Sequence, residues 1–324
     1  MTTADTLGGI GELATLARIF PRLPAATSQL LGPGDDAAVV AAPDGRFVVT
    51  TDMMIHGPDF RLAWSSPFDL GWKAAASNLA DVAAMGAVPT ALVVAIAAPP
   101  DSPVSLMEGI SDGLREACAA LAPGCGVVGG DLSASATLTI AVTAFGDLEG
   151  RAPVLRSGAR AGDVVAVAGV LGQAAAGLRL LFSEGMRDGA PSTAAATTLR
   201  AEHPEQVGAQ LAPAPPIALG PVAALAGATA MLDLSDGLAL DARRIAKASG
   251  VALDLDSALV GSREALDGGE DHSLLACFAP GTAVPDGFRI IGRVVPGHGL
   301  LVDGTPYDAL GGWDPYAGWN GKVG

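Results

Sequence analysis

The segment PFDLGWKAAASNLADVAAMG, residues 67–86, predicts a long helix that ends at Gly86, where glycine can terminate it. Most of its side chains are small and apolar, so the helix is expected to be buried. One acid, Asp81, lies among small apolar neighbours. A carboxylate on a largely apolar helix is costly to bury alone. The plain interpretation is that Asp81 faces water, and the alternative is that it has a partner elsewhere in the fold.

Helical and extended patterns alternate on both sides of this segment. We expect helices at 11–20, 104–121, 172–182, 220–227 and 238–249, and strands at 39–40, 47–51, 91–97, 126–128, 138–145, 164–168, 288–295 and one ending at Leu234. Residues 184 to 206 are expected to be irregular. The pattern favours an α/β or α+β protein. A turn-rich, basic segment near Gly150 predicts two domains, 1–150 and 151–324.

The composition limits the possible functions. Half of the 324 residues are hydrophobic and the net charge is −15, which disfavours binding to nucleic acid. An anionic substrate would need cations to bridge it to such a protein. The three cysteines have no metal-site spacing, and we expect them to be core residues of a reducing compartment. No signal peptide or membrane-length apolar run is present, so we expect a cytoplasmic protein without a membrane partner.

Four short acidic motifs are expected at turns. They are Gly34-Asp35-Asp36, Thr50-Thr51-Asp52, Gly129-Gly130-Asp131 and Asp233-Leu234-Ser235-Asp236-Gly237. Each has a plain structural interpretation, because Asp beside Gly favours turns and Asp236 is a possible N-cap. However, Thr51-Asp52 and Asp233 to Asp236 are expected at the ends of apolar strands, where α/β folds place ligands.

Gathering these acids in one place would require cations. Two carboxylates about 4 Å apart repel each other by roughly 4 kcal/mol at an effective dielectric of about 20. Oxygen ligands without His or Cys suit Mg²⁺, which commonly joins carboxylates to substrate phosphates. The glycines before Asp131 would let backbone amides approach a phosphate. The chain has neither a P-loop motif nor a protein-kinase catalytic loop. These features together favour phosphoryl transfer.

Over nearly its whole length the sequence resembles the thiamine-monophosphate kinase family. The matching segments occur in family order and are GPGDDAAV, TTDMMIHGPDF, WKAAASNLADVAAMGA, VVGGDLS, VLRSGARAGD, GVLGQAAAGL, LDLSDGL, DGGEDHSL and GWDPY. The resemblance implies the two-domain fold of the superfamily that includes aminoimidazole ribonucleotide synthetase and selenophosphate synthetase. It also implies a homodimer joined through the N-terminal domains.

The resemblance implies roles for individual residues. Mg²⁺ would be bound by Asp35, Asp36, Thr50, Thr51, Asp52, Asp81, Asp131, Asp233 and Asp236. ATP would be contacted by Gly130, Asp131, Arg156 and Ser235. Glu270 and Trp313 would line the thiamine pocket, where an indole face suits the thiazolium cation. The plain alternatives are a core or tail anchor for Trp313 and a linker salt bridge for Arg156.

One position departs from the family pattern. Relatives commonly carry a substrate-contacting His where this chain has Asp59, and His56 lies three residues earlier. Three explanations remain open. Asp59 turns away and His56 reaches the substrate phosphate, or Asp59 holds a bridging cation, or the substrate differs. His56 as a solvated loop residue is the plain alternative.

The implied reaction is ATP plus thiamine monophosphate giving ADP plus thiamine diphosphate. The attacking phosphate oxygen is already anionic, so no catalytic base is expected. Other enzymes of the superfamily are disfavoured. The first cysteine is Cys118, whereas a selenophosphate synthetase should have a reactive one near its N-terminus, and a hydrogenase-maturation relative should end in cysteine. Aminoimidazole ribonucleotide synthetase lacks the GGED and GWD context, and a non-catalytic nucleotide-binding regulator rarely needs so many acids.

Overall fold

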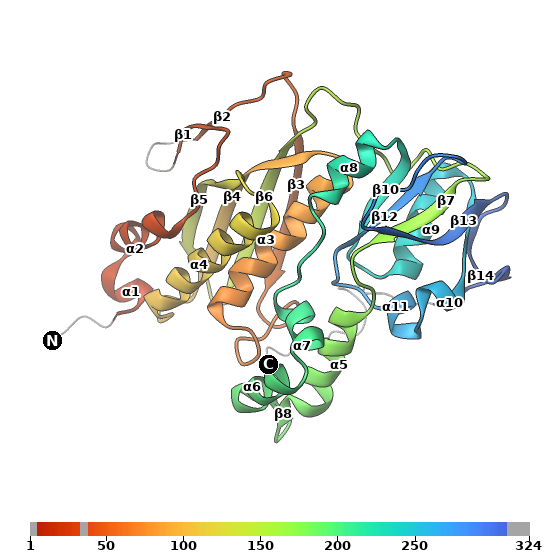
Figure 1. Ribbon diagram of the computed structural model, residues 1–324. Coiled ribbons are helices and arrows are strands. Elements are labelled where there is room, and N and C mark those ends of the chain that lie inside the picture. The colour runs from red at the N-terminus through yellow and green to blue at the C-terminus, as the bar shows by residue number, and fades with distance from the viewer. Residues whose placement is uncertain (1–4, 33–37, 310–324) are drawn as a thin grey trace.

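The computed structural model describes residues 5–32 and 38–309. It contains two large mixed sheets with helices packed on them (Figure 1), and two small two-stranded sheets. This confirms the expected class of α/β or α+β protein. The predicted residues Asp35, Asp36 and Trp313 lie outside the described part of the chain.

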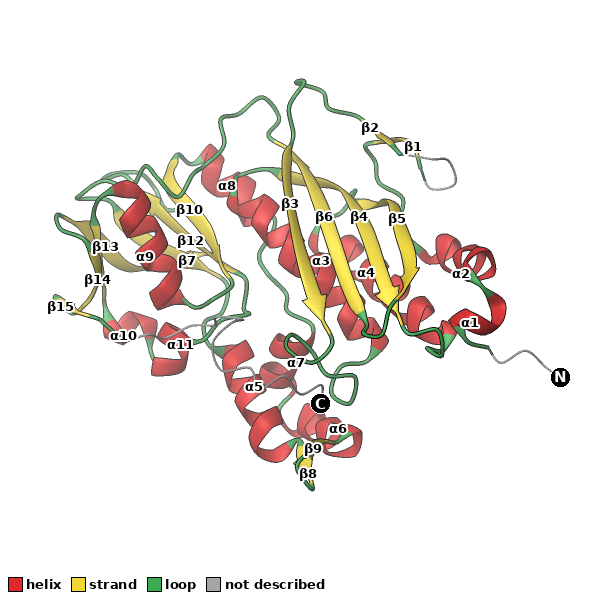
Figure 2. Cartoon of the chain, turned by 180° about the vertical axis from the view of Figure 1, so that it is seen from behind, coloured by secondary structure: helices red, strands yellow, loops and turns green. Residues whose placement is uncertain are grey.

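The first sheet has four strands in the order β3-β6-β4-β5. Their bounds are β3 Val48–Ile55, β6 Thr139–Asp147, β4 Val88–Ala98 and β5 Gly126–Ala134. Two long helices, α3 (Pro67–Ala84) and α4 (Val104–Leu121), cover one face of this sheet, and Figure 2 shows the other face. The strand β3 is at the edge next to the second half of the molecule.

The helices α3 and α4 pack closely because glycines lie between them. A Cβ added to Gly71 would stand 2.0 Å from the carbonyl oxygen of Ile110, and one added to Gly113 would stand 2.1 Å from that of Phe68. Neither site has room for a side chain. The close contact holds α3 in a fixed position against the sheet, with Leu79 fully buried below it.

The second sheet has seven strands in the order β10-β12-β7-β13-β11-β14-β15. Their bounds are β10 Ala228–Leu234, β12 Ser273–Phe278, β7 Val164–Ala168, β13 Phe288–Val295, β11 Ala252–Leu255, β14 Gly299–Val302 and β15 Thr305–Pro306. One face packs on α9 (Leu238–Ser249) and on the short helix α11 (Arg263–Asp267). The other packs on α8 (Leu219–Leu225) and on the end of α3. The helix α3 therefore touches both sheets.

A cluster of three helices lies at the N-terminal end of α3 (Figure 1). It comprises α5 (Gln173–Glu184), α6 (Thr193–Glu202) and α7 (Pro204–Leu211), with the two-residue strands β8 (Met186–Arg187) and β9 (Ala190–Pro191) between α5 and α6. Arg200 of α6 makes a bidentate ion pair with the buried Asp69 of α3, at 2.8 and 2.7 Å. Trp64 donates its indole N–H to the carbonyl of Gly185 at 3.1 Å. These contacts attach the cluster to α3 and to the loop that precedes it.

Shorter elements complete the described chain. They are α1 Leu7–Ile10, α2 Glu12–Ile19, the 3₁₀ turn η1 Phe20–Arg22, β1 Gln29–Leu31, β2 Val39–Val40 and α10 Ser257–Val260. The three cysteines are buried and unpaired, as expected for core residues. Among the described helices none has the length and apolar character required to span a membrane.

Three local predictions are wrong. Gly129-Gly130-Asp131 is not a loop, because β5 runs through it and pairs in parallel with β4. Thr51-Asp52 is not at a strand end, because β3 continues to Ile55. Residues 184 to 206 are not irregular, since they contain β8, β9, α6 and the start of α7. Glycine and polar residues locally favour breaks in a strand, but pairing with β4 and β6 and packing on α3 outweigh these local preferences.

Candidate active site

The ionisable side chains of the candidate site gather where the edge strand β3 meets the second half of the molecule. The polar residues of α3 hold this edge. Asn78 accepts a hydrogen bond from the backbone N–H of Asp52 at 3.1 Å, and Asp81 accepts one from the hydroxyl of Thr50 at 2.8 Å. The edge strand is thereby joined to the helix that carries Asp81. Asp81 has a hydrogen-bond partner in the fold and does not simply face water.

Three acids from distant parts of the chain share this region. Burial, followed by the charges of Asp233 and Asp52, raises the pKa of Asp81 to about 7. Burial also raises the pKa of Asp52, with further contributions from Asp233, Glu270 and Asp236. No Lys or Arg of the described chain makes an ion pair with Asp52 or Asp81. Asp52 and Asp81 therefore have no direct ion-pair partner among the described lysines and arginines, whereas Asp236 and Glu270 have one.

The described residues contain no group of three or more Asp, Glu, His or Cys side chains arranged to hold a metal ion by themselves. An ion here would need further oxygen ligands, such as those of a phosphate. Asp233 is already engaged on one side, because its carboxylate lies 3.1 Å from the Nδ1 atom of His272. Burial alone would lower the pKa of His272, but the hydrogen bond and charge of Asp233 raise it overall.

The segment from Gly268 to His272 connects the parts of the site. Three consecutive side chains point to three different elements. Glu270 pairs with Lys73 of α3, Asp271 accepts from the backbone N–H groups of Gly172 and Ala174 at the start of α5, and His272 faces Asp233 on β10. The backbone requires glycine, since a Cβ on Gly269 would stand 2.4 Å from the carbonyl oxygen of Ser235.

The backbone of this segment is strained as well as crowded. Glu270 has φ 72° and His272 has φ 51°, in a region that side-chain-bearing residues rarely adopt. The N–H of Glu270 donates to the carbonyl of Ser235 at 2.8 Å, and that of His272 donates to Leu234 at 3.1 Å. Strain of this kind concentrates at functional sites, where the surrounding structure maintains it.

The turn after β10 is held by an ion-pair network. Arg244 pairs with both Asp236 and Asp241, and the buried Asp241 accepts from the backbone N–H groups of Asp236 and Gly237, each at 3.1 Å. Asp236, a predicted metal ligand, is thus already bound to a guanidinium in this structure. Ser235 is half-buried beside it and accepts from Glu270.

Two other predicted ligands, Thr51 and Asp131, lie on the opposite face of the first sheet. In the pairing register Asp52 is in one row with Val142 and Val94, which face the helices. Asp131 is in the next row with Met53 and Ala95, which are exposed on the open face. Thr51 is also on that face, where it accepts from Thr143 at 3.1 Å.

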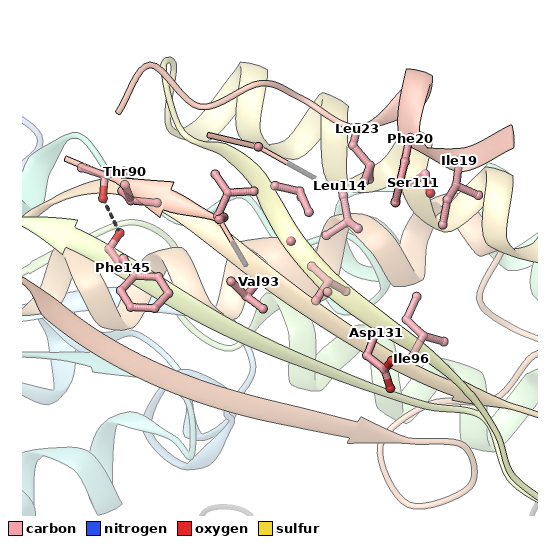
Figure 3. A pocket seen from close by; sticks show the side chains of 18 of the residues that line it. Ile19, Phe20, Leu23, Thr90, Val93, Ile96, Ser111, Leu114, Asp131 and Phe145 are labelled. Carbon is pink, nitrogen blue, oxygen red and sulfur yellow. Dashed lines mark hydrogen bonds between the residues drawn. The ribbon is translucent and has the colours of Figure 1, made fainter. Parts of the chain in front are cut away.

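Gly129, Gly130 and Asp131 line a pocket of about 920 Å³ that runs along β5 between the sheet and α2 (Figure 3). Figure 3 shows Asp131 and Ile96 toward one end and Phe145 toward the other. Its walls are largely apolar, including Leu23 and Leu114. Gly32 and Ala38, which flank residues 33–37, line the same pocket. A Cβ on Gly130 would stand 2.0 Å from the carbonyl oxygen of Val94, so this position must be glycine.

Arg156, a predicted ATP contact, lies next to β10, whereas Ser235 follows the end of that strand. Arg156 is exposed, its carbonyl accepts from Ser249 at 3.0 Å, and its neighbour Leu155 accepts from the N–H of Met231. Ser235 follows Met231 by four residues, which corresponds to about 13 Å of strand. The structure of one chain therefore does not bring the backbones of Arg156 and Ser235 together.

The loop after β3 carries His56 and Asp59. Asp59 accepts a hydrogen bond from the N–H of Ile55, and burial raises its pKa. The ring of His56 stacks on Phe60 with 5.5 Å between ring centres. Burial, followed by the charge of Arg61, lowers the pKa of His56, so its ring is neutral at neutral pH.

Sequence reasoning missed four residues of the site: Lys73, Asn78, Arg244 and His272. A signal was present for Lys73, since a lysine followed by three alanines on a buried helix needs a counter-ion. No comparable signal marked His272, because its contact with Asp233 depends on the antiparallel pairing of β10 with β12.

Comparisons with known proteins agree on the family. Residues 34–148 match the family described as AIR synthase related protein, N-terminal domain. The thiamine-monophosphate kinase of Mycobacterium tuberculosis is 46% identical, over 98% of this chain and 93% of that relative.

Two solved structures are similar over most of the chain. That of the thiamine-monophosphate kinase from Stenotrophomonas maltophilia has a TM-score of 0.76 and 31% identity, and covers 92% of this chain and 98% of its own. The structure of AaThiL complexed with AMPPCP and TMP has a TM-score of 0.72 and 33% identity, and covers 86% and 90%. The chain belongs to the thiamine-monophosphate kinase family.

Proposed function

We propose that this protein transfers the γ-phosphoryl group of ATP to thiamine monophosphate, giving thiamine diphosphate and ADP. The observation that carries the proposal is the gathering of Asp52, Asp81 and Asp233 beside Glu270, on strained and interlocked backbone. Family membership and the AaThiL structure, which is complexed with AMPPCP and TMP, support the same reaction.

Magnesium fits these residues. Burial, followed by the charges of Asp233 and Asp52, raises the pKa of Asp81, and a divalent cation would stabilise the charged carboxylate against both effects. Oxygen donors alone suit Mg²⁺ better than a transition metal. The proposed ligands on the helix-covered side of the first sheet and beside it are Thr50, Asp52, Asp81, Asp233 and Asp236. The other ligands of the sequence prediction are Thr51 and Asp131, which lie on the open face of that sheet, and Asp35 and Asp36, which lie outside the described residues. When bound, Mg²⁺ would neutralise the charge of the phosphates.

The chain itself supplies position and orientation. Gly130, Asp131, Arg156 and Ser235 are the proposed ATP contacts. The open backbone at Gly129, where an added Cβ would meet nothing within 4 Å, leaves space for a phosphate to approach. The acceptor oxygen of thiamine monophosphate is anionic before the reaction, so the chain needs no general base. Its task is alignment of the two phosphates.

The substrate's organic part would be bound near Glu270. A partly exposed carboxylate there attracts the thiazolium cation, and Trp313 would add a cation–π contact. His56 and Asp59 lie on the loop proposed to approach the substrate phosphate. Asp59 accepts a hydrogen bond from the N–H of Ile55 on that loop, which supports the first of the three explanations.

We further infer a cytoplasmic homodimer with a division of each chain near residue 150. The open face of the first sheet supports dimerisation, since Val49 and Met53 are 53% and 58% exposed on or beside it. Asp131 and Thr51 lie on that same face. The first sheet ends at residue 147 and the second begins at 164, which supports the domain boundary.

The test is a coupled assay for ADP release with thiamine monophosphate, free thiamine and other phosphate monoesters as acceptors. We expect turnover with thiamine monophosphate alone and a requirement for Mg²⁺. Release of AMP with free thiamine would indicate pyrophosphoryl transfer and would contradict the proposal.

A further inference from the structure

Lys73 is a buried cation that the proposed reaction has not yet used. It lies on α3, is 7% exposed, and is followed by Ala74 to Ala76, which are almost completely buried. Its ammonium group pairs with the carboxylate of Glu270 and donates to the carbonyl of Gln210 at 3.0 Å. A lysine is rarely buried unless it is paired, so this position is built for a specific partner.

That partner is held so that one side of it stays available. The side chain of Glu270 is 34% exposed, whereas that of Lys73 is 8% exposed. Lys73 occupies one carboxylate oxygen of Glu270, and the N–H of Glu270 is tied to Ser235 at 2.8 Å. Both ends of the residue are therefore held, while 34% of the side-chain surface stays exposed.

Electrostatics make this pairing necessary. Glu270 lies near Asp52 and Asp59, and its charge contributes to the raised pKa of both. Burial works to raise the pKa of Glu270 itself, but Lys73 and then His272 lower it overall. Without Lys73 the carboxylate would take up a proton or turn away from its acidic neighbours.

The ion pair between Lys73 and Glu270 also joins the two halves of the molecule. Lys73 comes from the helix that packs on the first sheet, and Glu270 follows α11 next to the second. An anionic oxygen fixed at this junction is a site for a cation or for an N–H donor. The thiamine part of the proposed substrate offers both, in its thiazolium ring and its aminopyrimidine.

We propose that Lys73 is a positioning residue that orients Glu270 and so determines the affinity for the thiamine part of the substrate. It acts through Glu270 and does not touch the transferred phosphoryl group. This inference rests on the proposed function, because the cationic ligand is the substrate named there.

The experiment is a double-mutant cycle of Lys73→Met and Glu270→Gln, with the Kd for thiamine monophosphate measured by calorimetry. We expect Lys73→Met to raise this Kd at least tenfold while the KM for ATP stays within twofold. In the Glu270→Gln background the same change should add less than twofold, because its target is gone. Lys73→Arg should retain part of the affinity.

A matched control separates this role from support of the fold. Arg200→Met removes another ion pair of α3, the one with Asp69, and leaves Glu270 untouched. It should lower the melting temperature without raising the Kd. If Lys73→Met alone fails to fold, the double variant still lacks both charges. Its Kd for thiamine monophosphate can then be compared with that of Glu270→Gln, and the two should agree within twofold.

Several outcomes would overturn the proposal. An unchanged Kd in Lys73→Met, an equal increase in both backgrounds, or an equal loss of ATP affinity would each exclude positioning through Glu270. The two levels of inference stay distinguishable. A wild-type protein that does not bind thiamine monophosphate contradicts the proposed function, whereas a binding wild type with an unaffected Lys73→Met variant contradicts only the role of Lys73.

Discussion

The carboxylate of Asp59 accepts a hydrogen bond from the backbone N–H of Ile55 at 2.7 Å, so this side chain folds back onto its own loop. An asparagine would offer an oxygen at the same place. We expect Asp59→Asn to leave kcat and the KM for thiamine monophosphate within twofold of wild type. Asp59→Ala should cost about 1 kcal/mol of stability, as typical for one hydrogen bond. Steady-state kinetics and thermal unfolding measure the two effects. A large rise in KM for Asp59→Asn would favour a bridging cation instead.

His56 is the proposed replacement for the histidine that relatives carry at position 59. Its ring stacks on Phe60, and its Nε2 atom is buried without a hydrogen-bond partner among the described residues. A neutral imidazole still donates one N–H. We expect His56→Ala to raise the KM for thiamine monophosphate several-fold with kcat little changed. Asp59→His should partly rescue the loss. An unchanged KM for thiamine monophosphate in His56→Ala would contradict this explanation.

The two glycines before Asp131 offer a matched pair of substitutions. A Cβ at Gly130 would stand 2.0 Å from the carbonyl oxygen of Val94, whereas one at Gly129 would meet nothing within 4 Å. Gly130→Ala should therefore destabilise the protein by about 2 kcal/mol or more, since overpacking moves the backbone. Gly129→Ala should keep its melting temperature and raise the KM for ATP. An unaltered KM would place the phosphates elsewhere.

The burial of Asp81 predicts how stability depends on pH and metal. Its folded-state pKa of about 7 exceeds the ordinary value of 3.8 for an aspartate, so the folded state holds this proton more tightly than the unfolded state does. In EDTA the free energy of unfolding should fall as pH rises from about 4 to about 7, through this group. Asp81→Asn should remove that fall and raise the melting temperature at pH 8.

Magnesium should raise the stability of the wild type, whereas the ionisation of buried Asp81 lowers it. A ligand that binds only the folded state raises the melting temperature. We expect Mg²⁺ to stabilise wild type at pH 8 but to stabilise Asp81→Asn much less, and turnover by the variant should be lost. Thermal unfolding with and without Mg²⁺ provides the measurement. Equal stabilisation of both proteins would remove Asp81 from the proposed ligands.

The sequence predicts regular elements well where local signals are strong. The helix at 104–121, the strand at 164–168 and the helix at 238–249 have the expected bounds. These segments combine clear periodicity with turn residues at their ends. The strand β5 lacks such local signals, because its glycines are tolerated in a strand only through pairing with β4. Such pairing is a long-range property that no local pattern shows.

The site could be predicted as a set of residues but not as an arrangement. Asp52, Asp81 and Asp233 were expected together, and their mutual effects on pKa show that they share a region. The separation of Asp131 from Asp52 by the sheet could not be foreseen, because a strand was expected only to Val128. The register of β5 assigns Asp131 to the open face, and register depends on the partner strand.

The open face of the first sheet leads to a prediction about assembly. Met53 is 58% exposed there, on the face that carries Asp131. Met53→Glu would put a charge into the proposed dimer interface, where an unpaired buried charge is strongly unfavourable. We expect the variant to be monomeric in light scattering after size exclusion, with a lower kcat if the second copy completes the site. Leu225→Glu is the control, because Leu225 is 71% exposed on α8, outside this sheet. If both variants keep the mass of wild type, the dimer does not form through this face.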